Sequence, residues 1–236
     1  MFILSCKYMP HSPVRKSVDS ILKHHPNEKI VIVDSQSDNH DYHEFFSEYD
    51  TVEVLYNINK YRTPGAFYEA CKRYPDEPYY VNIHDSVMIK KPLHKFIDSD
   101  EEFVAFGYFP DTLHKVCGGV ETRHEYQYMK KVFANTKYFL PNLSTNFNSC
   151  FGPLYIIKNS MMKRLMDSGM LEKIKSTSKI EDQMYERIMG ILAEQEGYNL
   201  VDHNIEGNLY ANNNQKWDCM VSDKLEYFTK RLLKRD

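Results

Sequence analysis

Short and almost continuous apolar runs recur through the first 85 residues. They are Phe2–Cys6, Ile30–Val33, Val52–Tyr56 and Tyr79–Ile83. Runs of this length without polar alternation are typical of strands buried on both faces. Between them, apolar residues recur at helical spacing from Val14 to His25 and from about Pro64 to Tyr74. This alternation predicts an α/β fold with a Rossmann-type, mostly parallel sheet flanked by helices.

The second half of the chain has a less regular pattern and predicts a mixed arrangement. We expect strands over Phe103–Phe109 and over Cys150–Ile157, the latter broken by Gly152 and Pro153. Helices are predicted over His124–Phe133, Asn159–Met166, Ile180–Glu196 and Leu225–Leu233. Without a repeat or a low-complexity linker, we expect a single domain over residues 1–236.

Polar residues follow each of the first four predicted strands. They are Ser5 to Tyr8, then Asp34 and Ser35, then Asn57, Asn59, Lys60 and Arg62, and finally His84, Asp85 and Ser86. In an open α/β sheet, ligands bind beyond the carboxyl ends of the strands. We therefore expect these four clusters to converge at one edge of the sheet and to form a binding site there.

This order of elements resembles the nucleotide-sugar half of GT-A glycosyltransferases of the family-2-like type. In that family an acid after the second strand contacts the nucleobase, and an Asp-x-Asp motif after the fourth strand binds a divalent metal. The segments Asp34–Asp38 and Tyr79–Ser86 fill these two places, although the second offers a single carboxylate. The resemblance implies that residues 1–95 bind a nucleotide sugar and that residues 96–236 form the acceptor and catalytic half.

The resemblance assigns metal and donor contacts. Asp85 would hold Mn²⁺ or Mg²⁺, since such cations take few protein ligands and keep phosphate oxygens and waters. A buried aspartate that caps the next turn is the alternative. His203, at the end of a short strand predicted over Gly197–His203, would be a second ligand suited to Mn²⁺, or else an ordinary surface histidine. Donor contacts are expected from Ser5, Lys7, Asp34, Lys60, Arg62 and His84. For Lys60 and Arg62, a solvated basic turn is the alternative.

An acidic pair begins the predicted helix near residue 180. Ser178 and Glu181 have the spacing of a capping box, which gives Glu181 a structural role and leaves Asp182 available. By resemblance to inverting GT-A enzymes, Asp182 with Glu181 beside it would deprotonate the acceptor hydroxyl, and Arg187 would orient it. A purely structural pair favoured by the helix dipole is the alternative.

The segment Asn148–Pro153 resembles the acceptor-side segment that lines the sugar pocket in this family. Within it, Phe151 and Gly152 are the expected acceptor-side residues, because a glycine lets backbone approach a ligand closely.

Composition narrows the partners and the compartment. The net charge of −3 lacks the basic excess of proteins that bind nucleic acids. Five cysteines without a Cys-x-x-Cys pair suggest neither a disulfide framework nor a thiolate zinc site. The first apolar run is too short for a signal peptide, and no stretch reaches the ~18 apolar residues of a membrane span. We therefore expect a cytoplasmic or cytoplasm-facing protein.

The predicted activity is metal-dependent transfer of a sugar from a UDP-, GDP- or dTDP-linked donor to a hydroxyl, with inversion. The acceptor would be a glycan, a lipid-linked molecule or a protein. The basic C-terminal residues allow a weak peripheral contact with an anionic membrane, or simply suit a helix C-terminus. Two alternatives stay open. A nucleotidyltransferase would need a glycine-rich loop, which Lys7–Ser12 lacks. A non-catalytic binding or scaffold protein would keep the fold without the chemistry.

Overall fold

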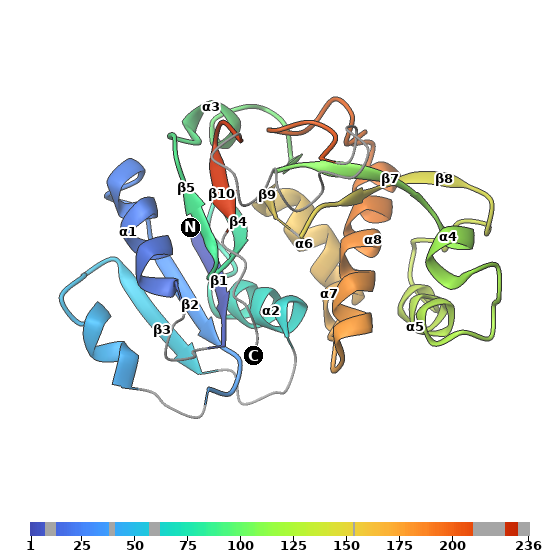
Figure 1. The fold of residues 1–236 in the computed structure, drawn as a ribbon, viewed down its shortest axis with the longest axis horizontal. Helices are drawn as coiled ribbons and strands as arrows, with labels where there is room; N and C mark the ends of the chain where they lie inside the picture. The colour runs from blue at the N-terminus through green and yellow to red at the C-terminus, as the bar shows by residue number, and fades with distance from the viewer. Residues whose placement is uncertain (8–12, 38–40, 57–61, 153, 210–224, 231–236) are drawn as a thin grey trace.

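The computed structural model describes residues 1–7, 13–37, 41–56, 62–152, 154–209 and 225–230 (Figure 1). Its central sheet has six strands in the order β3–β2–β1–β4–β9–β6. They are β1 (Phe2–Cys6), β2 (Ile30–Asp34), β3 (Val52–Tyr56), β4 (Tyr79–His84), β6 (Phe103–Ala105) and β9 (Tyr155–Lys158). β1 to β4 pair in parallel, and only β9 runs antiparallel to its neighbours. The prediction of a mostly parallel α/β sheet is confirmed.

Helices cover both faces of this sheet. They are α1 (Val14–His24), α2 (Thr63–Arg73), α3 (His94–Ile97), α4 (Leu113–Cys117), α5 (His124–Phe133), α6 (Asn159–Asp167), α7 (Met170–Lys173) and α8 (Lys179–Gln195), with a 3-10 helix η1 over Asp41–Phe46. α1 and α3 pack on one face, and α2 and α5 to α8 pack on the other. Each face has its own hydrophobic core. In β1, Phe2 and Leu4 belong to the core under α1 and α3, and Ile3 belongs to the core on the opposite face. The strand is continuously apolar because both of its faces are buried.

Two smaller sheets complete the second half of the chain. β7 (Tyr108–Thr112) pairs with β8 (Asn146–Cys150), and β5 (Val87–Ile89) pairs with β10 (Phe228–Lys230), both in antiparallel fashion. Figure 1 shows the β7–β8 ribbon extending away from the main sheet and running across α8. The β8 strand packs directly along α8. No helix in the described part of the chain is long and apolar enough to cross a membrane.

Three expected elements of the second half are wrong. The strand predicted over Phe103–Phe109 is two strands, β6 and β7, which belong to different sheets. The terminal helix predicted from Leu225 is replaced by β10, in which Phe228 is fully buried and pairs with Ile89. The residues that follow, 231–236, and the basic side chains among them lie outside the described part. No strand forms over Gly197–His203, which is a series of turns.

His25, just after α1, is a buried neutral histidine. Its side chain is 1% exposed, and its Nε2 accepts a hydrogen bond of 3.0 Å from the Leu93 backbone N–H. The ring also lies 4.7 Å from the His94 ring. Burial lowers the pKa of His25 to about 4, and the neighbouring His94 charge acts in the same direction, against the opposing charge of Glu28. The fold therefore holds this imidazole in its neutral form.

This burial predicts a specific loss of stability in acid. The pKa of His25 is about 4 in the folded state, whereas an ordinary histidine, as in the unfolded chain, has a pKa of 6.5. The free energy of unfolding is therefore highest above pH 6.5 with respect to this group. It decreases by about 3 kcal/mol as the pH falls towards 4 and the unfolded state takes up the proton first. Urea unfolding measured between pH 7 and pH 4 should show this decrease. A His25→Gln variant should show a flatter profile over the same range. Parallel profiles for the two proteins would contradict the assignment.

Candidate active site at the carboxyl edge of the sheet

The polar ends of the parallel strands meet at one edge, as the sequence predicted for the part that is described. Ser5 is in register with His84, and Cys6 is in register with Asp34. Backbone hydrogen bonds continue past the strands: the Asp85 N–H donates to the Ser5 carbonyl at 3.2 Å, and the Ser35 N–H donates to the Cys6 carbonyl at 2.7 Å. The turns that carry Asp85 and Ser35 are thereby fixed against the end of β1.

The start of α2 is attached to the same edge. The buried Ser5 hydroxyl donates to the buried Thr63 hydroxyl at 3.4 Å. Thr63 is the first residue of α2 and is followed by Pro64, a residue type suited to the first turn of a helix. Arg62 precedes the helix, and its backbone N–H donates to the Ser176 carbonyl at 3.2 Å. The edge of the sheet is therefore joined to the segment that leads into α8.

The N-terminus of α8 brings its acidic pair to this junction. Asp182 Oδ2 lies 3.8 Å from the Arg62 guanidinium, and its other oxygen lies 3.5 Å from the Ser176 hydroxyl. The Arg62 and Asp182 side chains are 39% and 22% exposed, so both reach solvent. The structure therefore places a predicted donor contact and the predicted base side by side, although the two are far apart in the sequence.

Glu181 has a capping role, as its spacing predicted. The Ser178 hydroxyl accepts a hydrogen bond from the Glu181 backbone N–H at 3.2 Å. The Glu181 carboxylate accepts hydrogen bonds from the Thr177 backbone and hydroxyl, and it lies 3.3 Å from His124. Burial alone would raise the pKa of Glu181, but these hydrogen bonds and the His124 charge outweigh it and lower the pKa. Glu181 stays ionised within the cap, and its side chain is 13% exposed against 22% for Asp182, so Asp182 is the more accessible of the two carboxylates.

Arg187 does not orient Asp182, contrary to expectation. Its guanidinium lies 3.1 Å from Asp111 Oδ2 and 4.9 Å from the centre of the Phe109 ring. Asp111 is only 6% exposed, so Arg187 neutralises a nearly buried carboxylate of β7. Asp111 was missed from the sequence because it lies in an irregular polar stretch without a recognisable spacing. On the other side of this contact, Phe109 meets Phe151 edge-to-face at 6.3 Å.

The remaining donor-side residues differ in access. Asp34 is fully buried, and its Oδ1 accepts a hydrogen bond of 2.8 Å from the Ser37 N–H, so it closes the turn in which Gln36 has φ +58°. His84 and Asp85 are half-buried, and Lys7 is exposed. Lys60 lies outside the described residues. Asp85 is thus neither packed in the interior nor fully in solvent, and it lies where the fourth-strand motif was expected.

The described residues supply few metal ligands. Within them, no group of three His, Cys, Asp or Glu side chains comes together. His203 is not beside Asp85: its carbonyl binds the Ala105 N–H, and its ring is 3.0 Å from Glu101. Three strand spacings separate this position from β4, which is about 14 Å. His203 therefore lies too far from Asp85 to share a cation with it.

The acceptor-side residues lie where β8 leads into β9. Phe151 is 7% exposed, and its backbone N–H donates to the Gly107 carbonyl at 2.9 Å. Gly152 has φ +61°, a conformation that favours glycine. Gly152 is therefore explained by the turn itself, and a role in ligand approach stays a prediction.

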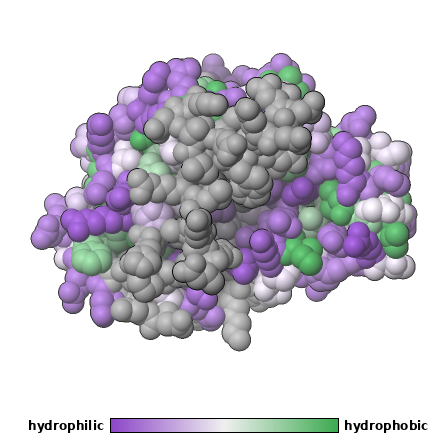
Figure 2. Space-filling model, in the orientation of Figure 1, coloured by the Kyte–Doolittle hydropathy of each residue, from purple (hydrophilic) through white to green (hydrophobic). Residues whose placement is uncertain are grey.

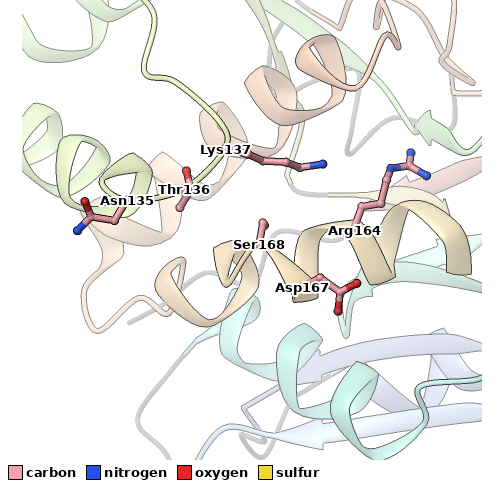
Figure 3. Close-up of a pocket in the computed structure, with 6 residues that line it drawn as sticks. All are labelled: Asn135, Thr136, Lys137, Arg164, Asp167 and Ser168. Atoms are coloured by element: carbon pink, nitrogen blue, oxygen red, sulfur yellow. The ribbon is translucent and has the colours of Figure 1, made fainter.

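A hollow of about 390 Å³ lies away from this edge and is bounded by α6 and the segment after α5 (Figure 3). Its cations are already paired: Lys137 lies 3.0 Å from Glu196, and Arg164 binds both Glu196 and Glu102 at 2.6 Å. Hydrogen bonding to Arg164 lowers the pKa of Glu102 to about 2. These ion pairs tie α6 to the ends of β6 and α8, and we assign the cluster a structural role.

Comparison with known proteins yields similarities of structure only. A scan against protein-family models gives no match, and a search of the curated proteins gives none either. Among solved structures, S. aureus TarS 1-349 in complex with UDP is 16% identical, with a TM-score of 0.47 over 81% of this chain and 55% of that one. GalNAc-T7 with UDP, GalNAc and Mn²⁺ is 14% identical, with a TM-score of 0.40 over 46% of this chain and 23% of that one. The chain spans about half or less of the length of these proteins.

Proposed function

We propose that this chain transfers a sugar from a nucleoside-diphosphate sugar to an acceptor hydroxyl. The observation that carries the proposal is the contact between Arg62 and Asp182. It places a solvent-accessible carboxylate of the second half next to the strand ends where a donor would bind. In an open α/β sheet this edge is the usual position for a ligand. In this proposal, residues 1–95 and 96–236 are two halves of one domain, and the site lies where they meet.

Asp182 is the proposed general base. General-base catalysis needs a carboxylate within hydrogen-bond reach of the attacking hydroxyl. Ser176 and Arg62 each lie near one Asp182 oxygen, and the partial exposure of the side chain gives an acceptor access to it. Attack by a hydroxyl deprotonated at Asp182 would displace the diphosphate in one step and invert the anomeric carbon. Arg62 would pass from Asp182 to the donor phosphates or bridge the two, because its guanidinium offers several donors.

Asp85 is the proposed metal ligand. It fits the role as a single half-buried carboxylate at the end of β4, with its backbone fixed to Ser5. A Mn²⁺ or Mg²⁺ ion bound with the donor would neutralise the developing charge of the diphosphate. Because such an ion keeps phosphate and water oxygens in its shell, one protein carboxylate is compatible with its binding. The acceptor would be a glycan, a lipid-linked molecule or a protein.

Nucleotide-induced stabilisation tests the donor site. UDP, GDP and dTDP are compared with and without Mn²⁺ by thermal unfolding. At 100 times its Kd, the preferred nucleotide should raise Tm by about 5–10 °C. An Asp85→Asn variant should lose the Mn²⁺-dependent part of the shift, whereas Asp98→Asn, an exposed aspartate after α3, should keep it.

The other outcomes separate the alternatives. If no nucleotide stabilises the protein, the proposal is wrong and a scaffold role is favoured. A stronger shift with nucleoside triphosphates than with diphosphates would favour a nucleotidyltransferase. A Mn²⁺-dependent shift that survives in Asp85→Asn would remove Asp85 from the metal site and leave the donor site in place.

A further inference from the structure

A second hollow, of about 330 Å³, lies at the far end of α8. One wall is the C-terminal part of α8, and the other is the segment 139–147 that leads into β8. Its lining includes Phe139, Asn142, Thr145, Asn146, Glu194 and Gln195. Phe147 and Ile191 are almost completely buried and supply apolar surface, whereas the polar lining residues are all exposed or half-buried and form a polar rim. Its volume is at the lower end of the range for small-molecule sites.

Phe139 provides an exposed aromatic surface at this hollow. Its side chain is 66% exposed, the largest exposure of a large apolar side chain in the described part of the chain. The Gln195 side chain fixes its backbone from both sides, since Gln195 Oε1 accepts from the Phe139 N–H at 3.1 Å and Gln195 Nε2 donates to the Phe139 carbonyl at 2.7 Å. The described part of the face in Figure 2 is mostly hydrophilic, with small separate apolar areas. An exposed aromatic ring on a backbone that is fixed in this way suits a ligand with one flat apolar face.

Glu194 provides an oriented carboxylate in the same lining. Its Oε1 accepts hydrogen bonds from the Asn148 backbone N–H at 2.9 Å and from the Asn148 amide at 3.1 Å. Both of these hydrogen bonds use Oε1, so they fix the direction of the carboxylate, and Oε2 is an acceptor on the same group. Burial raises the pKa of Glu194, and the Asn148 hydrogen bonds oppose that shift. The amides of Asn142 and Asn146 and the Thr145 hydroxyl lie exposed around it.

We propose that this hollow binds carbohydrate. A pyranose ring has an apolar C–H face for Phe139 and a rim of hydroxyls for Glu194 and the side-chain amides. The lining contains no Lys, Arg or His, so it has no group to neutralise a phosphate or another anion. It is also too polar at its rim for a purely apolar ligand. The chemistry of the lining therefore fits an uncharged oligosaccharide.

The hollow is distinct from the sheet-edge site. Glu194 and Asp182 lie twelve residues apart on α8, which is about 18 Å along the helix axis. The inference stands without the proposed transferase activity. If that activity is also correct, the hollow would hold a distant part of a polymeric glycan acceptor whose end reaches Asp182.

Binding of soluble oligosaccharides to the full chain tests the inference. The panel consists of tetrasaccharides of glucose, galactose, mannose and N-acetylglucosamine, measured by saturation-transfer NMR and titration calorimetry. We expect saturable binding of at least one of them, weakened about tenfold by Phe139→Ala and by Glu194→Gln. Val201→Ala, at an apolar side chain that is 49% exposed elsewhere, is the matched control and should bind as the parent does. Because Phe139 is mostly exposed, its replacement should leave Tm unchanged.

Three outcomes would overturn the inference. They are the absence of saturable binding across the panel, binding unaffected by both Phe139→Ala and Glu194→Gln, and binding abolished by Asp182→Asn instead, which would place the sugar at the sheet edge. Failure of the proposed transferase function gives a different pattern. In that case no nucleotide would bind, but oligosaccharide binding would still depend on Phe139.

Discussion

An Asp182→Asn variant is expected to lose about 10³-fold in the rate of sugar transfer while it binds the donor nucleotide as the parent does. Asparagine has the same shape as aspartate and keeps an oxygen for the Ser176 hydroxyl, but it cannot take a proton from the acceptor. The loss should therefore appear in kcat and not in the affinity for nucleotide. Release of nucleoside diphosphate, followed with the donor that gives the largest thermal shift, measures the rate.

Glu181→Gln is the matched control for this prediction. Glu181 has the neighbouring position and the same charge, yet it is occupied by the Thr177 hydrogen bonds at the start of α8. We expect Glu181→Gln to lower stability by about 1 kcal/mol through the weakened cap and to change kcat much less than Asp182→Asn. If Glu181→Gln instead loses the activity and Asp182→Asn retains it, the roles of the two acids are reversed.

The first half of the fold could be predicted from the sequence because its signals are local. The strands over Phe2–Cys6 and Val52–Tyr56 have the predicted bounds, and those predicted over Ile30–Val33 and Tyr79–Ile83 extend by one residue each. In β1, β2 and most of β4 every residue is buried, so continuous apolar runs mark these strands directly, whereas the edge strand β3 is only half-buried. The convergence of the strand ends at one edge then follows from parallel pairing and needs no knowledge of distant contacts.

Elements that depend on distant partners could not be predicted. The stretch from Leu225 carries a helical pattern, but Phe228 is buried against Ile89, about 140 residues earlier, and pairing as a strand overrides the local preference. At Gly107 an added Cβ would lie 2.5 Å from Leu209, so a segment from the far end of the chain crosses there and separates β6 from β7. Nothing in the sequence of residues 103–109 predicts that contact.

In the candidate site, too, local features could be predicted and contacts between distant residues could not. Ser178 and Glu181 form the predicted cap because the motif is four residues long. The partner of Asp182 is Arg62, which precedes a different helix, whereas the nearby Arg187 turns to Asp111. Sequence spacing can place a carboxylate at a helix start, but the choice between two arginines depends on how α2, α8 and β7 pack together.

Gly190→Ala is expected to destabilise the protein by about 4 kcal/mol and to lower Tm by about 10 °C. Gly190 lies in the middle of α8 where the helix crosses β8, and an added Cβ would come within 1.9 Å of the Asn148 carbonyl oxygen. Because that oxygen belongs to a strand paired with β7, it cannot move without displacing the β7–β8 ribbon. Urea unfolding of the parent and the variant gives the difference.

The sign of this change separates close packing from helix propensity. Alanine in place of glycine inside a helix ordinarily stabilises it by about 1 kcal/mol, so destabilisation at Gly190 has to come from the contact with β8. Gly197→Ala is the control for a glycine without close packing. Gly197 has φ +96°, and nothing lies within 4 Å of an added Cβ. Its replacement should therefore destabilise the protein only through the backbone conformation, by about 1 kcal/mol. Since β8 also carries Asn148, the partner of Glu194, Gly190→Ala should weaken oligosaccharide binding as well. A neutral or stabilising Gly190→Ala would mean that α8 and β8 do not touch at this point.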